Sequence, residues 1–323
     1  MKKIILGVIV VAIIAIIITS NIDNKTNYKI GVIGPMTGSF ASFGEEGKKG
    51  IESLDTSGID FVYEDDACDA TKAVTAFRKL TNIDQVKFII GPGCGAPQEA
   101  IAPILKDKDI VELLPSAASN TLYETSGGKM FNAQYSLEAE SKFLADKIYE
   151  KGYKNVVLIT YQNAFSKVHR DTFVENFKGN IVKEISFIDP SMDVSTELSK
   201  LKRLSFDAIF STDLTFFLNN GMNKLKRYGI DDPVYTQYTA GLPAVRDFVE
   251  GVIYSYPSDV DQNQGIAYNM ARYSAQILSS AIKECDGVVY CVKEKISQDG
   301  FVNGVRERKL ILKKIEGGRV VSL

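Results

Sequence analysis

Two kinds of segment alternate along the chain from residue 28 onwards. Short runs rich in β-branched residues predict strands, and the longer segments between them, with apolar residues at helical spacing, predict amphipathic helices. The predicted strands are "YKIGVIG", "IDFVYED", "KFIIG", "DIVELLP", "NVVLIT", "IVKEISF", "DAIFST" and "PVYTQ", and the helical segments include 70–83, 138–152 and 215–228. Strand followed by helix, repeated, is typical of parallel sheets with crossover helices.

The long helical segment at 138–152 separates the first four predicted strands from the last four. We therefore predict an α/β fold with two doubly wound, parallel-sheet lobes. The 323 residues, 45% of them hydrophobic, are enough for two domains with large buried cores. Because parallel sheets bind ligands beyond the carboxyl ends of their strands, the loops at those ends are the first candidates for a site.

The chain opens with a different pattern. Met1-Lys2-Lys3 precedes fifteen residues, 4–18, that are all Ala, Val, Ile or Leu apart from Gly7, and the polar stretch "TSNIDNKTN" follows. A positive start, a short apolar run and a polar exit indicate an export signal over residues 1–20. The run is shorter than the ~20 residues of a membrane span, yet no Ala-x-Ala cleavage site follows it. A cleaved signal and a retained membrane anchor therefore both stay open, with the folded part outside the membrane.

The charge balance narrows the class of partner. The chain has 38 Lys and Arg residues against 40 Asp and Glu residues, a net charge of −2, and no basic run. A protein that binds phosphate backbones normally carries a basic surface. We therefore predict no nucleic-acid partner.

Export changes the interpretation of the four cysteines, because oxidising compartments favour disulfides. Cys68 and Cys94 each follow a predicted strand, and if those strands are neighbours in one sheet, a disulfide can join their carboxyl ends. Cys285 and Cys291 can form a second, local disulfide. Four acids surround Cys68, but a thiolate mixed with carboxylates suits neither hard nor soft cations, so we predict no metal site. The acids in this stretch, Glu64, Asp65, Asp66 and Asp69, are expected to be mostly solvated loop residues.

Three loops in the first half of the chain follow predicted strands and are rich in small residues. They are "GPMTGSFASFG" (34–44), "GPGCGA" (91–96) and "PSAASN" (115–120). Each leads into a helix, so its backbone N–H groups can converge on an anion such as a carboxylate. The alternative interpretation is that all three are tight turns between strand and helix.

The motifs of enzymes are weak in this sequence. "GPGCGA" matches the dinucleotide-binding pattern G-x-G-x-x-G/A, with Glu112 about 20 residues on. Glu112, however, lies inside its predicted strand and not at the strand's tip. The single histidine, His169, falls in an amphipathic helical stretch, where a surface or helix-face position is expected. We therefore predict that the protein is not an enzyme and carries no cofactor.

Four stretches in the first half carry a family resemblance. "YKIGVIGPMTGSFASFGEEGKKGIE", "YEDDACDATKAV", "FIIGPGCGAPQEAIAPI" and "LPSAASNTLYE", in this order, resemble the leucine/isoleucine/valine-binding protein family. Its members are type I periplasmic solute-binding components of ABC transporters. The resemblance implies two lobes, joined by three crossover strands, that close on a small ligand and dock on membrane permeases. It also implies a Cys68–Cys94 disulfide, with lobe 1 at 28–136 and 255–302 and lobe 2 at 137–254 and 303–323.

The resemblance also implies ligand-binding positions. Phe43 matches an aromatic residue that packs on the ligand, while Ala117 and Ser119 match positions that offer a carbonyl and a hydroxyl to an amino acid. Gly95 stands where a hydroxyl residue is usual, so only its backbone N–H can bind a carboxylate. Phe165 and Leu214 lie near positions that are often Tyr, and the usual acid of lobe 2 falls near Tyr238 and Thr239, neither of them acidic. The full candidate set is Ser39, Phe43, Cys94, Gly95, Ala96, Ala117, Ser119, Phe165, Asp213 and Thr239.

Asp213 has two interpretations. It follows the predicted strand 208–211 and precedes a helix, which places its carboxylate at the edge of the lobe 2 sheet that faces the cleft. Asp is a favoured helix N-cap. The carboxylate can instead pair with a cationic group of a ligand.

The predicted function is that of an extracytoplasmic solute-binding component of an ABC-type importer. Its ligand would be an amino acid or a related amide or organic acid, and permease subunits would be its partners. The alternative is a membrane-tethered, ligand-sensing ectodomain of the same fold that works without a transporter.

Overall fold

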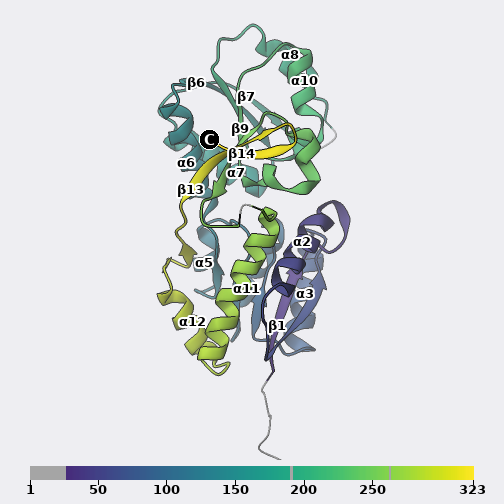
Figure 1. Cartoon of the computed structure of the whole chain (residues 1–323), viewed down its shortest axis with the longest axis vertical. Helices are drawn as coiled ribbons and strands as arrows, with labels where there is room; N and C mark the ends of the chain where they lie inside the picture. The colour runs from purple at the N-terminus through teal and green to yellow at the C-terminus, as the bar shows by residue number, and fades with distance from the viewer. Residues whose placement is uncertain (1–26, 190–191, 262) are drawn as a thin grey trace, which may run out of the picture.

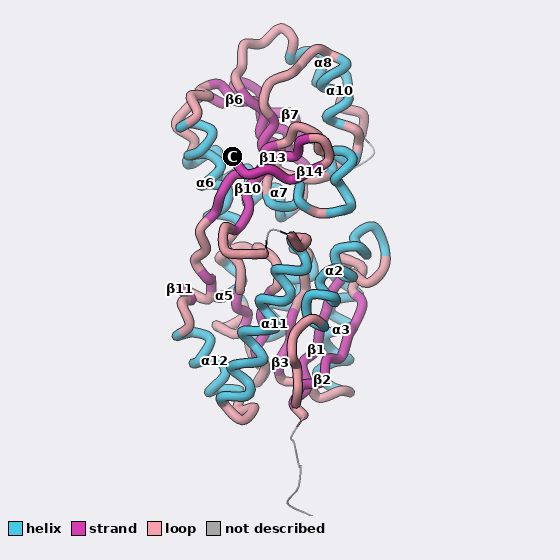
Figure 2. The backbone as a smooth tube through the Cα atoms, in the orientation of Figure 1, coloured by secondary structure: helices cyan, strands magenta, loops and turns pink. Residues whose placement is uncertain are grey.

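All eight strands predicted from the sequence are present, and they divide between two α/β lobes. The computed structural model describes residues 27–189, 192–261 and 263–323. The lobes follow one another along the long axis of the molecule (Figure 1). In each lobe, helices flank a central sheet (Figure 2). This arrangement confirms the predicted fold class.

Lobe 1 contains a seven-stranded sheet in the order β11-β12-β5-β4-β3-β1-β2. The pairs from β2 to β12 are parallel, and β11 pairs antiparallel with β12. Its elements are β1 (Tyr28–Gly34), η1 (Gly38–Phe40), α2 (Ala41–Glu52), β2 (Ile59–Asp65), α3 (Ala70–Asn82), β3 (Phe88–Ile90), α4 (Gly95–Leu105), β4 (Val111–Leu114), α5 (Thr121–Thr125), β5 (Met130–Asn132), α11 (Ile266–Glu284), α12 (Val289–Gln298), β11 (Phe301–Val302) and β12 (Val305–Arg306).

Lobe 2 contains a second seven-stranded sheet, in the order β14-β13-β10-β9-β8-β6-β7. The last two strands of the chain, β13 and β14, run antiparallel to their neighbours. The elements are α6 (Leu137–Glu150), β6 (Asn155–Tyr161), α7 (Ala164–Asn176), β7 (Asn180–Phe187), α8 (Ser195–Leu201), β8 (Ala208–Ser211), α9 (Thr215–Leu218), α10 (Gly221–Arg227), β9 (Val234–Thr236), η2 (Tyr238–Gly241), η3 (Pro243–Phe248), β10 (Ile253–Pro257), β13 (Leu310–Glu316) and β14 (Arg319–Ser322).

Each sheet is covered on both faces, which explains why its central strands read as continuous apolar runs. In lobe 1, α2 and α11 pack together on one face, and α3 and α4 pack together on the other. In lobe 2, α6 and α7 cover one face. The opposite face belongs to a cluster that includes apolar residues of α8 and α10 and extends to the start of α11 in lobe 1.

The chain crosses between the lobes three times: after β5, after β10 and after β12. The expected change of lobe at residue 255 is wrong by a few residues, because all of β10 pairs with β9 and β13 in lobe 2. The change expected after residue 302 is early, because Val305 of β12 pairs with Asn132 in lobe 1.

The helix predicted at 215–228 is two short helices, α9 and α10. Asn220, between them, adopts a left-handed backbone conformation with φ 63°. Asn tolerates this conformation better than most residues, and one such residue is enough to interrupt a helix.

The predicted signal or anchor at residues 1–20 lies outside the described residues. Within the described ranges, every helix is too short or too polar to cross a lipid bilayer.

Candidate functional site

The carboxyl edge of the lobe 1 sheet is fastened by a disulfide between Cys68 and Cys94, whose Cα atoms are 5.5 Å apart. Cys68 follows β2, and Cys94 caps α4 after β3. The two strands are not direct neighbours in the sheet, because β1 lies between them. The disulfide therefore bridges over the end of β1 and joins the two loops on either side of it. Cys285 and Cys291 form the second disulfide.

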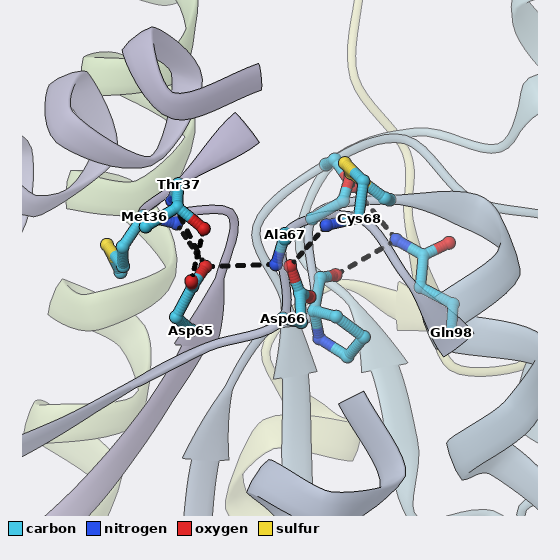
Figure 3. The surroundings of a disulfide bond; sticks show 11 residues. Met36, Thr37, Asp65, Asp66, Ala67, Cys68 and Gln98 are labelled. Atoms are coloured by element: carbon cyan, nitrogen blue, oxygen red, sulfur yellow. Dashed lines mark hydrogen bonds between the residues drawn. A yellow bond between two sulfur atoms is a disulfide. The ribbon is translucent and has the colours of Figure 1, made fainter. Parts of the chain in front are cut away.

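The acids beside Cys68 hold the same edge in place. Asp65 Oδ1 accepts hydrogen bonds from the backbone N–H groups of Met36 (2.8 Å), Thr37 (3.1 Å) and Ala67 (2.9 Å), as Figure 3 shows. Burial alone would raise the pKa of Asp65, but these bonds and one from the Thr37 hydroxyl lower it. The carboxylate thus ties the loop after β1 to the loop after β2.

Asp66 corrects the expectation that these acids are mostly solvated, because its side chain is fully buried. Its Oδ1 accepts the Cys68 N–H at 2.9 Å, and burial raises its pKa to about 6. Asp69 caps α3 by accepting the Lys72 N–H. In the described part of the chain, no group of His, Cys, Asp and Glu side chains is arranged to hold a metal ion.

A buried glutamine joins two of the three small-residue loops. Gln98 Nε2 donates to the Pro92 carbonyl (3.1 Å) and to Ser116 Oγ (2.9 Å), and Ser116 Oγ donates to the Gly93 carbonyl. This network sets loop 91–96 beside loop 115–120. Gly95 and Ala96 begin α4, so their backbone N–H groups stand at a helix N-terminus on the edge that faces lobe 2.

Three of the predicted site residues pack in an apolar cluster that spans both lobes. Phe43, Ala117 and Phe165 belong to one apolar cluster, which also includes Leu214 and Tyr238. A β-carbon added at Gly95 would lie 3.9 Å from Phe165 Cβ, so the start of α4 in lobe 1 touches α7 in lobe 2. The lobes are therefore closed on each other at this point.

Phe43 fills the space above the Gly-rich loop. A β-carbon at Gly93 would lie 2.6 Å from Phe43 Cε1, so only glycine lets the ring pack there. Phe43 also lines a cavity of about 30 Å³ in lobe 1, which is far below the volume of a ligand pocket. A separate cavity of about 1030 Å³ lies beside the crossovers, between Tyr123, Tyr135 and Arg306 among others.

Other predicted site residues have protein partners or lie in solvent. Ser119 Oγ donates to Glu138 Oε1 at 2.9 Å, which ties loop 115–120 to the first turn of α6. Ser39, in η1, and Ala96 are exposed. Thr239 is buried in η2, and its Oγ1 has no hydrogen-bond partner in the described part of the protein. Thr239 is therefore the hydroxyl of the predicted set that is best placed to accept a new partner.

Asp213 supports a turn in lobe 2. Its Oδ1 accepts the Thr215 N–H at 2.7 Å, and its Oδ2 accepts Asn163 Nδ2 at 3.0 Å. The N-cap of α9 is Leu214, so the prediction that Asp213 caps this helix is wrong by one residue. The Asp213 carboxylate instead accepts a hydrogen bond from the backbone N–H two residues later in the chain, as Asp commonly does in turns. Asn163 in turn caps α7 through Ser166.

Lobe 2 contains a buried pair, Glu140 and His169, next to Phe165. The sequence did not predict this pair. Glu140 Oε1 accepts the Tyr238 N–H at 2.8 Å and a hydrogen bond from the Ser255 hydroxyl. Its Oε2 lies 3.7 Å from His169 Nε2, and among the described residues neither of these two atoms has a hydrogen-bond partner. The Phe165 and His169 rings are 4.6 Å apart, so the pair contacts the interlobe cluster.

Burial shifts the pKa values of both members of this pair. It raises the pKa of Glu140 to about 7, although hydrogen bonds from Ser255 and Tyr238 oppose the rise, and it lowers the pKa of His169 to about 3. His169 lies on the buried face of α7, so of the two expected positions the surface one is wrong. Glu140 lies three residues after Leu137 and four before Leu144, which places it on the apolar face of the predicted helix. An acid at such a position is the sequence feature that could have indicated a buried carboxylate.

The geometry of Glu112 argues against a dinucleotide site. This residue lies within β4, fully buried, and burial raises its pKa well above the ordinary value. It therefore does not reach the sheet edge, where a ribose would bind.

Comparisons with known proteins show which family the chain resembles. Residues 27–306 match the family model described as "Periplasmic binding protein". The chain is 29% identical over 137 residues to the leucine-, isoleucine-, valine-, threonine- and alanine-binding protein of Pseudomonas aeruginosa, covering 39% of this chain and 36% of that protein. It is 25% identical over 207 residues to the Leu/Ile/Val-binding protein of Escherichia coli K12, covering 59% and 56%. The matches thus span about a third to a half of these curated relatives.

Solved structures share the fold over nearly the whole chain. The leucine-binding protein LivK from Thermotoga maritima has a TM-score of 0.81 at 20% identity and covers 92% of this chain and 97% of its own. A solute-binding protein from Rhodopseudomonas palustris in complex with 4-hydroxybenzoate has a TM-score of 0.79 at 18% identity, covering 92% and 95%. The substrate-binding protein LivJ of Streptococcus pneumoniae, in complex with isoleucine, has 0.79 at 18%, covering 91% and 97%.

The family consists of solute-binding proteins and not of enzymes. With two closed α/β lobes, three crossovers and a family match over most of its length, the chain belongs to the periplasmic binding protein family, in the type I group that includes the leucine/isoleucine/valine-binding proteins.

Proposed function

We propose that the protein is the extracytoplasmic solute-binding component of an ABC-type importer and holds a small carboxylate-bearing ligand between its lobes. The observation that carries this proposal is the contact of the two carboxyl sheet edges, where Gly95 of lobe 1 lies against Phe165 of lobe 2 and Phe43 packs in the same cluster. Parallel sheets bind ligands at this edge.

The ligand class follows from the chemistry of this edge. The N-terminus of α4, at Gly95 and Ala96, offers backbone N–H groups to an anion. The relatives bind amino acids or 4-hydroxybenzoate, and these ligands share a carboxylate. Phe43 and Phe165 supply apolar contact, and Thr239 supplies a buried hydroxyl without a partner among the described residues. We therefore place the carboxylate at α4 and the remainder of the ligand against lobe 2.

Entry of a ligand requires the lobes to separate, since Phe43 and Phe165 pack in the same interlobe cluster in the present structure. The three crossovers are the natural hinge for this motion. A ligand that binds between the lobes then stabilises the closed form and raises the free energy of unfolding.

The first experiment is a thermal-shift screen of amino acids, their amides, urea and small aliphatic and aromatic acids. A ligand present at 100 times its Kd adds about 2.7 kcal/mol of stability. At least one carboxylate-bearing compound is expected to raise the melting temperature, and its uncharged amide is expected to do so less. A hit confined to compounds without a carboxylate would contradict the proposed ligand class.

Asp213→Asn tests whether lobe 2 also binds a cationic group. If Asp213 pairs with an ammonium, the Asn variant loses roughly ten- to hundredfold in affinity, as for a lost charge-assisted hydrogen bond. If Asp213 only supports its turn, the affinity stays nearly unchanged. Asp207→Asn is the matched control, because Asp207 accepts hydrogen bonds from the backbone N–H groups of Lys154 and Asn155 at the start of β6, which is the amino end of the same sheet.

The alternative is a ligand-sensing ectodomain that works without a transporter. Both functions predict tight binding without turnover, so binding alone does not separate them. Genes for permease subunits beside this one, and ligand uptake that is lost when this protein is deleted, would favour the importer. Unchanged uptake in the deletion strain would favour the sensor.

A further inference from the structure

One arginine joins the three crossovers between the lobes. Crossover 1 is residues 133–136, crossover 2 is residues 258–265 and crossover 3 is residues 307–309. Arg308, in crossover 3, donates from Nε (3.1 Å) and from Nη2 (2.7 Å) to the carboxylate of Asp259 in crossover 2. Its Nη1 donates to Gln134 Oε1 in crossover 1. A single side chain thus holds all three connections together.

The same network is fixed to α11 of lobe 1. The side chain of Arg308 is only 1% exposed, and its guanidinium carbon lies 4.6 Å from the centre of the Tyr273 ring in α11. Gln134 is fully buried, and its Nε2 donates to the Met270 carbonyl in α11 at 3.3 Å. Asp259 lies two residues after β10 and Arg308 two residues before β13, both strands of lobe 2. The network therefore ties the connections of lobe 2 to a helix of lobe 1.

The arrangement depends on the shape of the arginine side chain. A guanidinium group presents its N–H donors in a rigid planar fork, so two of them bind one carboxylate while a third reaches another acceptor. A lysine ammonium is a compact charge on a flexible stem and does not reproduce this fork. Arg308 therefore holds Asp259 and Gln134 at fixed mutual positions. We call Arg308, Asp259, Gln134 and Tyr273 the hinge clasp.

The hinge clasp lies where the lobes must rotate for the cleft to open. Rotation changes the backbone of the crossovers and hence the mutual positions of the three segments that Arg308 joins. The cavity of about 1030 Å³ beside the crossovers borders Arg308, so no packed core fixes the crossovers on that side. We propose that the hinge clasp favours the closed form of the protein before any ligand binds.

This inference concerns the regulation of the proposed binding site. It rests on the proposed function only in taking the closed form as the form that holds the ligand. The apparent affinity of a ligand falls with the fraction of molecules in the binding form, so the hinge clasp would raise affinity without a contact to the ligand. The opening of the lobes itself is measurable without any ligand.

The test measures the distance between two spin labels, one on each lobe of the full-length protein, by double electron–electron resonance. The four native cysteines are paired in disulfides, so labels attach to the introduced residues of Lys49→Cys in α2 and Lys226→Cys in α10. Both lysines are exposed. In Figure 1, α2 and α10 lie to the right of the long axis, while the segment 307–309 runs on the left. Opening at the crossovers therefore lengthens the distance between the labels.

Two variants of the hinge clasp are compared with matched controls. Arg308→Lys is paired with Arg306→Lys, because Arg306 binds Asp299 at 2.8 Å and stacks on Phe301, both in lobe 1. Asp259→Ala is paired with Asp299→Ala. The two carboxylates are 50% and 55% exposed, so neither alanine variant is expected to prevent folding.

Without ligand, the wild type is expected to show mainly the short distance of the closed form. In Arg308→Lys the ratio of closed to open molecules should fall about tenfold, as for a lost charge-assisted hydrogen bond, and Asp259→Ala should shift it in the same direction. The controls should match the wild type. If Arg308→Lys does not fold, Asp259→Ala decides alone.

Three results would overturn the proposal: a wild type that is mainly open without ligand, unchanged distances in both clasp variants, or equal shifts in the controls. The thermal-shift screen reports on the proposed function separately. A screen without any hit leaves these distances as they are, and unchanged distances leave a hit as it is.

Discussion

The carboxyl edges of the two sheets are built by different means. In lobe 1, a disulfide and the carboxylate of Asp65 fasten the loops after β1, β2 and β3 to one another. In lobe 2, side-chain hydrogen bonds join the loops, from Asn163 to the Asp213 carboxylate and between Ser166 and Thr212. Lobe 2 also keeps the buried pair Glu140 and His169 behind this edge.

This difference suggests a division of labour between the lobes. The sequence motifs that resemble the family coincide in lobe 1 with the residues that fasten its edge, such as Cys68 and Cys94. They therefore identify a rigid half of the site and say little about the ligand. Both lobes hold buried polar atoms without hydrogen-bond partners in the described structure, at Asp66 in lobe 1 and at Thr239 and Glu140 in lobe 2. Of these three residues, Thr239 alone belongs to the predicted ligand-binding set.

The largest expected effect is the loss of the Cys68–Cys94 disulfide. Replacing both residues by Ser removes a link across a sequence separation of 26, worth about 3 to 4 kcal/mol in the chain-entropy model. The same replacement of Cys285 and Cys291, with a separation of 6, should cost about 2 kcal/mol. Urea denaturation of both variants measures the difference. Equal losses would remove the special role assigned to the lobe 1 edge.

The next effect is a pH dependence that originates in lobe 2. Because burial raises the pKa of Glu140 to about 7, the native state keeps this proton while the unfolded chain loses it near the ordinary value of 4.5. Stability from this group is present below pH 4.5 and is lost as the pH rises through 7. In Glu140→Gln this loss is absent, so the wild type should lose about 3 kcal/mol more stability than the variant between pH 4.5 and pH 8.

Unfolding curves at several pH values, for the wild type and Glu140→Gln, measure this effect. His169 has the opposite sign, since its lowered pKa removes stability only as the pH falls from 6.5 towards 3. A wild-type curve parallel to that of Glu140→Gln between pH 4.5 and 8 would show that Glu140 is ionised in the folded protein.

Asp65→Ala tests the fastening carboxylate of lobe 1. The variant leaves three backbone N–H groups without their acceptor, and a loss of about 2 kcal/mol is expected because part of the cost is recovered from water. The exposed Asp107, replaced by Ala, serves as the control and should change stability by less than about 0.5 kcal/mol. Similar values for the two variants would refute the role of Asp65.

The smallest effect is expected for the lobe 2 counterpart, Asn163→Ala. It removes the cap of α7 and the amide that holds Asp213 Oδ2, at a cost of about 1 kcal/mol. Asn176→Ala, at the other end of α7, is the matched control. If Asn163→Ala destabilises as much as Asp65→Ala, the two edges are fastened equally and the comparison above fails.

The sequence predicted the fold because long buried strands leave an apolar pattern. All eight predicted strands exist, and the strands that the sequence did not predict are β5, β10, β11, β12, β13 and β14. Of these, β11 and β12 have two residues each, too few for a pattern to develop. The helix at 215–228 was predicted as continuous because only the backbone of Asn220 interrupts it.

The site was less predictable because its contacts join distant residues. Phe43, Ala117 and Phe165 pack in one interlobe cluster, and their ligand-binding roles stay a prediction. The Glu140–His169 pair needs α6 and α7 to pack side by side, and Glu140 also contacts Tyr238 and Ser255 far along the chain. No local sequence pattern predicts such a pair. The one indication is the position of Glu140 on the apolar face of its helix.

The three crossovers also set the order in which the protein can fold as it is made. The five parallel strands of lobe 2 lie in one continuous stretch, whereas the lobe 1 sheet waits for Val305 to pair with Asn132, and for α11 to cover α2. A partly synthesised or partly exported chain therefore exposes the open edge of β5, and such edges readily pair with other chains. Lobe 2 is completed after lobe 1, by β13 and β14, so a chain that lacks its last residues leaves an open sheet edge in both lobes, at β5 and at β10.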